Sequence, residues 1–85
     1  MHIDYVFDVI RSEREYQKRR WPNSKKPSVA EEILLLRKHL KDFEENYYTE
    51  NDGSGLTPEV CLHDIRKMAA LLIRAMENHG AIKRL

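Results

Sequence analysis

The sequence predicts an all-α fold of three helices, a first helix followed by a long antiparallel pair that assembles as a homo-oligomer. Apolar residues recur three and four positions apart in each segment, and helix start and stop signals bound the segments. A single helical domain, 1–85, is expected, and a chain of 85 residues builds a marginal core that usually needs disulfides, a metal or oligomerisation. Cys61 is the only cysteine, and no cysteine or histidine pair has zinc-ligand spacing. Self-association is therefore the expected support.

The first helix is expected from near Asp4 to about Arg20. Its first half carries an apolar stripe and its second half is mostly polar. Pro22 restricts Trp21 and cannot extend the hydrogen-bond ladder, so the helix ends there. The stripe consists of Ile3, Val6, Phe7 and Ile10.

The second helix has the clearest start signal. Ser28 and Glu31 have the spacing of a capping box, in which each side chain accepts from the other residue's backbone amide. A seam of two apolar residues in seven follows, which is typical of a helix that packs on a partner helix. The seam is Val29, Ile33, Leu36, Leu40, Phe43 and Tyr47, and it is widened by Leu34 and Leu35.

The third helix is expected after a loop from Thr49 to Leu56. Thr57 is the expected N-cap with Pro58 in the first turn, and Gly80 is the expected left-handed C-cap. The short loop makes the second and third helices antiparallel neighbours. The residues expected in the buried stripe are Val60, Cys61, Ile65, Met68, Leu71, Leu72, Ala75 and Met76.

Charge is distributed unevenly along the chain. Between Arg11 and Lys26 there are seven basic and two acidic residues, whereas between Val29 and Glu50 there are six acidic and three basic residues. This asymmetry suits a small anionic ligand or contact between subunits. The net charge of +1 argues against a partner that is a DNA or RNA polymer. The absence of a long apolar run predicts neither a signal segment nor a membrane partner, and a soluble, cytoplasmic protein is expected.

No catalytic cluster is expected. Helical pyrophosphohydrolases of the MazG kind hold magnesium with an acidic motif on two helices. Here Glu31 and Glu32 are followed by Leu35 where the third acid belongs, so capping and a solvated face are the favoured interpretation of these acids. The four histidines are scattered and are expected at the surface or an interface. A non-enzymatic protein with no cofactor and no metal is predicted.

The basic segment at the end of the first helix is the most informative part of the sequence. It interleaves cations with Tyr16 and Trp21 and continues to Lys25 and Lys26. Aromatic faces stack on nucleobases and cations bind phosphates, so the segment is a candidate nucleotide site. The alternative is a solvated basic helix end with Trp21 in the core.

Three stretches together resemble a known family. They are Ser12–Gln17 with Trp21, Ser28–Glu32, and Ile65–Ala70 continuing to Ala75–Gly80. The pattern is similar to small phage proteins of the anti-CBASS sponge family. That resemblance implies an interlocked, three-helix homohexamer in the host cell cytoplasm. Such a protein sequesters, without cleavage, the cyclic oligonucleotides of bacterial CBASS immunity, such as 3′,3′-cyclic GMP-AMP (3',3'-cGAMP).

The same resemblance implies roles for individual residues. Tyr5 or Tyr16 is implied to stack on a base, and Lys25 or Lys26 to neutralise a phosphate. Arg66 is the candidate for a separate trinucleotide site. Two other functions stay open: a MazG-like enzyme with a degenerate metal site, and a helical protein–protein adaptor that uses the seam of the second helix.

Overall fold

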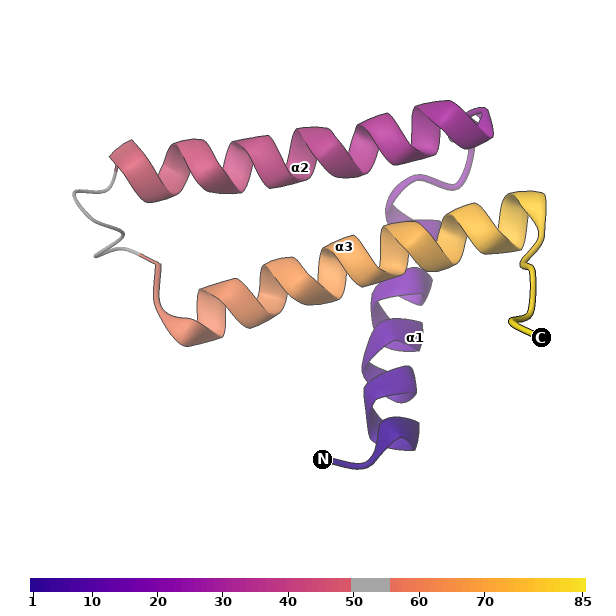
Figure 1. The fold of residues 1–85 in the computed structure, drawn as a ribbon, viewed down its shortest axis with the longest axis horizontal. Coiled ribbons are helices and arrows are strands. Elements are labelled where there is room, and N and C mark those ends of the chain that lie inside the picture. The colour runs from indigo at the N-terminus through magenta and orange to yellow at the C-terminus, as the bar shows by residue number, and fades with distance from the viewer. Residues whose placement is uncertain (50–55) are drawn as a thin grey trace.

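The computed structural model describes residues 1–49 and 56–85. Within these ranges the chain forms three helices, α1 (Ile3–Arg20), α2 (Val29–Thr49) and α3 (Pro58–His79), and no strand. In Figure 1, α2 and α3 lie side by side as an antiparallel pair, and α1 crosses α3. The predicted all-α, three-helix fold is confirmed. Residues 50–55 of the predicted loop lie outside the described residues.

The helix ends follow the local signals closely. Ser28 donates its backbone amide to Glu31 Oε1 at 3.0 Å, and Glu31 donates its amide to Ser28 Oγ at 3.2 Å, which confirms the capping box. Thr57 caps α3 by accepting from the Val60 amide at 3.2 Å. Gly80 ends α3 at φ +97° and ψ 169°, so its φ is positive as expected but its ψ is extended rather than left-handed helical.

The N-cap of α1 was not predicted from the sequence. His2 caps α1 with its ring, because Nδ1 accepts a hydrogen bond from the Asp4 amide at 3.1 Å. α1 therefore begins at Ile3 rather than at Asp4. Histidine is not among the residues that usually cap a helix N-terminus, so no pattern predicts this cap.

α3 is the element to which the other two helices attach. It packs against α1 and against α2, whereas α1 and α2 do not pack on each other in the described parts of the chain. Glu13 of α1 bonds Arg66 of α3, and Glu32 of α2 bonds Arg74. Ala70 lies one helical turn from both arginines and is fully buried. The centre of the fold is thus a small residue flanked by ion pairs.

The predicted burial of the α3 stripe is correct only in part. Cys61, Met68 and Leu71 are half-buried, but Ile65 is 56% exposed. The reason is geometric: two neighbouring helices cover only part of the surface of α3, and α1 attaches largely through charged residues. Val60, Leu72 and Met76 are exposed as well.

Apolar side chains are also exposed on the other two helices. Ile33 of α2 is 62% exposed and Phe7 of α1 is 51% exposed. The first half of α1 projects away from the helical pair (Figure 1). At the C-terminus, Ile82 and Leu85 are fully exposed and do not dock on the described part of the chain. No helix in the described ranges is long and apolar enough to cross a membrane.

Candidate functional site: a basic cavity beside the end of α1

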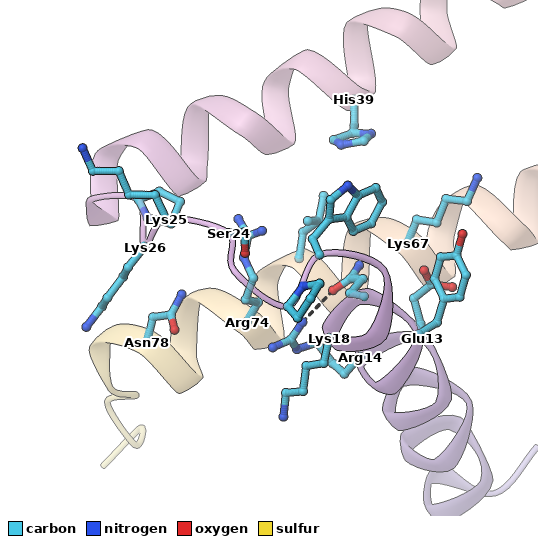
Figure 2. Close-up of a pocket in the computed structure, with 16 residues that line it drawn as sticks. Glu13, Arg14, Lys18, Ser24, Lys25, Lys26, His39, Lys67, Arg74 and Asn78 are labelled. Atoms are coloured by element: carbon cyan, nitrogen blue, oxygen red, sulfur yellow. Dashed lines mark hydrogen bonds between the residues drawn. The ribbon is translucent and has the colours of Figure 1, made fainter.

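A cavity of about 470 Å³ lies where the end of α1, the connecting segment 21–28 and the faces of α2 and α3 meet. Its volume falls within the range of roughly 300–1,000 Å³ that is usual for small-molecule sites. Figure 2 shows Lys25 and Lys26 at one end of the cavity and Lys67 with Glu13 at the other. The lining residues are Glu13, Arg14, Tyr16, Gln17, Lys18, Trp21, Pro22, Ser24, Lys25, Lys26, Pro27, His39, Lys67, Leu71, Arg74 and Asn78.

The cavity is strongly cationic. Two arginines and four lysines line it, against the single carboxylate of Glu13, which is already paired with Arg66 at 2.7 Å. Lys25, Lys26 and Lys67 make no ion pair or hydrogen bond with any described residue. Like charges gathered around a hollow repel one another, and an anion in the hollow relieves that repulsion. The uncompensated lysines therefore define the chemistry of the site.

An aromatic pair forms part of the cavity lining. The rings of Tyr16 and Trp21 meet edge to face with centroids 6.4 Å apart. Arg20 lies 5.7 Å from the centroid of the Trp21 ring. Trp21 is 56% exposed, so it is not the core residue of the alternative interpretation. Its ring is available to stack on a planar group.

Arg14 is the lining residue that is held by the most hydrogen bonds. Its Nε donates to Glu77 Oε1 at 2.9 Å, its Nη2 donates to Oε2 at 3.3 Å, and its Nη1 donates to Gln17 at 2.8 Å. The Arg14 hydrogen bond is the main cause that lowers the pKa of Glu77 below its usual value. Lys18 lies 3.4 Å from the same carboxylate. Arg14 is 8% exposed and therefore anchors the wall.

The structure brings together four of the six site residues that the sequence suggests. Tyr16, Trp21, Lys25 and Lys26 all line the cavity. Tyr5 does not line it and is 57% exposed on the projecting half of α1.

Arg66 also lies outside the cavity lining. Its Nε donates to Glu13 at 2.7 Å, and its Nη1 lies 2.7 Å from His63 Nδ1. In the single chain, therefore, the charge of Arg66 is compensated by Glu13.

Several lining residues were not suggested by the sequence. Lys67, Leu71, Arg74 and Asn78 are spaced four, three and four apart, which places them on one face of α3. That periodicity is visible in the sequence, but it does not reveal which helix end the face meets. His39 comes from α2 and completes the cavity opposite α3 (Figure 2).

The acids of the MazG comparison are used differently here. Glu31 caps α2, and its hydrogen bonds with Ser28, the backbone bond first, lower its pKa. The sequence predicts a solvated face for Glu32, and that prediction is wrong. The Glu32 carboxylate is only 1% exposed and lies 3.0 Å from Arg74. Burial requires such a carboxylate to be paired, and the arginine supplies the charge that a metal would bring. Within residues 1–49 and 56–85, no group of three metal-binding side chains converges.

Comparisons with protein-family models, curated proteins and solved structures find no match to this chain.

Proposed function

We propose that this protein is a non-catalytic phage immune-evasion protein, a sponge that binds and sequesters cyclic di- and trinucleotides of bacterial CBASS immunity in the host cytoplasm. The observation that carries the proposal is the cavity that is lined by Lys25, Lys26 and Lys67 together with the Trp21 ring. The lysines can bind phosphates, and the indole can stack on a nucleobase. The class of ligand that fits is a compact molecule that carries two anionic groups and an aromatic base.

The arrangement of charge supports a ligand with two separate phosphates. Lys25 and Lys26 occupy one end of the cavity and Lys67 the other, with His39 above them (Figure 2). A cyclic dinucleotide carries its two phosphates on opposite sides of a ring. Each phosphate then meets a different cationic end, and the two negative charges of the ligand offset two of the three lysine charges.

The exposed apolar side chains support self-association. Ile33, Leu34 and Leu40 of α2 are each about half exposed or more, with values of 62%, 58% and 49%. Exposed apolar side chains gathered on one helix favour an interaction site. We propose that further copies of the chain cover it, as a homohexamer. Light scattering should then give a mass near 61 kDa, six times the 10.1 kDa of one chain.

A helical adaptor is the second candidate, because the same α2 side chains fit the apolar face of a partner helix. Solution mass separates the two candidates. A monomer near 10.1 kDa that binds no cyclic nucleotide favours the adaptor.

Isothermal titration calorimetry with 3′,3′-cyclic GMP-AMP tests the proposed function. Sub-micromolar binding is expected, with the ligand recovered intact from the complex by mass spectrometry. A linear dinucleotide in the recovered ligand would show that the protein is an enzyme. Failure of cyclic di- and trinucleotides to bind below ~10 µM would refute the proposal.

The proposed trinucleotide site needs its own variant. Arg66 lies outside the cavity and is held by Glu13. If Arg66 holds cyclic trinucleotides at a separate site, Arg66→Gln should weaken their binding and leave 3′,3′-cyclic GMP-AMP binding unchanged. Equal losses for both ligands would assign Arg66 a structural role.

A further inference from the structure

The segment that carries Lys25 and Lys26 is tied to the far end of α3. The lysines are followed by Pro27, whose carbonyl oxygen lies 2.9 Å from His79 Nε2. His79 is the last residue of α3 and lies 52 positions further along the chain. Within the described residues, this hydrogen bond joins the connecting segment 21–28 to α3, and it falls next to the two lysines.

The same ring nitrogen faces a buried carboxylate. His79 Nε2 lies 2.8 Å from Glu32 Oε2. Both neighbours of Nε2 are acceptors, so the hydrogen must be on that nitrogen. The ring is oriented so that this hydrogen meets hydrogen-bond geometry toward the Pro27 carbonyl and not toward Glu32 Oε2. The carboxylate therefore acts on the imidazole through charge, and it selects the ring tautomer that can hold Pro27.

Glu32 is itself immobilised. Arg74 Nε donates to Glu32 Oε1 at 3.0 Å, and Asn78 Nδ2 lies 3.4 Å from the same oxygen. Arg74 and Asn78 also line the cavity, whereas Glu32 and His79 do not line it. The Glu32 carboxylate thus lies outside the cavity lining. It contacts two lining residues of α3 and also His79, which bonds the segment that carries Lys25 and Lys26.

We propose that His79 is a positioning residue: with Glu32 behind it, it fixes the Pro27 carbonyl and so holds Lys25 and Lys26 at the edge of the cavity. The inference rests on the proposed function, because it assigns the lysines the role of binding anionic groups. A flexible lysine loses conformational freedom when it binds a phosphate. A segment already fixed at Pro27 loses less, so the anion is bound more tightly.

A double-mutant cycle tests this role with 3′,3′-cyclic GMP-AMP as the probe. His79→Ala should weaken binding about five- to tenfold, the effect of one hydrogen bond. His79→Gln keeps an N–H donor and should recover most of the affinity. The loss caused by His79→Ala should shrink or vanish when Lys26 is already glutamine, because the His79–Pro27 hydrogen bond, called the latch below, acts through the lysines. Equal losses with and without Lys26 would overturn the proposal.

A matched control removes a different imidazole hydrogen bond at a helix end. His2→Ala deletes the bond to the Asp4 amide at the far end of α1, outside the cavity. It should lower thermal stability about as much as His79→Ala and leave affinity unchanged. If His79→Ala also lowers stability without changing affinity, its role is only structural.

Limited trypsin digestion tests the latch even when the probe does not bind. Cleavage after Lys25 should be about five- to tenfold faster in His79→Ala than in the wild type, and His79→Gln should lie between them. If the wild type binds no cyclic nucleotide but this order of rates holds, the proposed function fails and the latch stands. Identical rates in all three proteins would overturn the latch.

Discussion

Arg14 of α1 holds Glu77 of α3 with two nitrogens, Nε at 2.9 Å and Nη2 at 3.3 Å. The two residues are 63 positions apart in the chain. Arg14 is buried, and Glu77 lies at the surface beside Lys18. This pair fixes the end of α1 on α3 and so shapes one side of the cavity.

The Arg14–Glu77 pair predicts a pH dependence of stability. Because Arg14 lowers the pKa of Glu77 in the folded state, the stabilisation is complete above the unfolded value of 4.5 and is lost as the pH falls through the lowered value. Glu77→Gln should cost up to about 1 kcal/mol at pH 7, and the difference from wild type should shrink below pH 4. Urea unfolding at a series of pH values measures this. A difference that stays constant down to pH 2 contradicts it.

Glu32 should be the carboxylate on which the fold depends most. Glu32→Ala leaves Arg74 with an unpaired charge that is only 21% exposed, which should cost about 3 kcal/mol. Glu44→Ala changes the same charge at an exposed position of α2 and should change stability by less than about 0.5 kcal/mol. Chemical denaturation measures both. Similar values for the two variants would show that the buried pair contributes little.

Ala70 should tolerate no larger side chain. It is fully buried on α3, one turn from the arginines that bind α1 and α2. Ala70→Leu forces the helices apart and should cost about 2 kcal/mol or more. Ala30→Leu, at an exposed position of α2, is the control and should be near neutral. Thermal unfolding that leaves Ala70→Leu as stable as the control would place the packing elsewhere.

Trp21 should report ligand binding directly. The indole is exposed at the cavity and is the only tryptophan in the chain, so base stacking should change its fluorescence. Trp21→Ala should weaken 3′,3′-cyclic GMP-AMP binding about tenfold or more, as is usual for the loss of a stacking platform. Tyr48→Ala removes a 72% exposed aromatic ring outside the cavity and should leave affinity unchanged. Equal losses from both variants would rule out stacking on Trp21.

Local signals in the sequence were sufficient to predict the helices. The caps at Ser28 and Thr57 depend on residues three apart, and a pattern can show this. The burial of Glu13, Arg14 and Glu32 could not be predicted, because each partner lies between 42 and 63 positions away. From sequence alone, a charged residue is assigned to the solvent-exposed surface unless its distant partner is known.

The candidate site was likewise predictable only where its residues are close together in the sequence. Tyr16, Trp21, Lys25 and Lys26 are neighbours in sequence, so composition was enough to group them. Lys67 and His39 reach the cavity from two other helices, and only the helix packing brings them there. The half-exposed apolar stripes have the same origin: periodicity shows which face is apolar but not how much of it the other helices of the chain cover.

The most direct test of the cavity as the binding site is calorimetry on two charge-matched double variants. Lys25→Gln with Lys26→Gln removes two charges at the cavity, and Lys38→Gln with Lys41→Gln removes two charges on α2 outside it. The first pair should weaken 3′,3′-cyclic GMP-AMP binding roughly 30-fold or more, and the second pair should leave it within about twofold of wild type. Equal losses from the two pairs would contradict a site in this cavity and leave only general charge attraction.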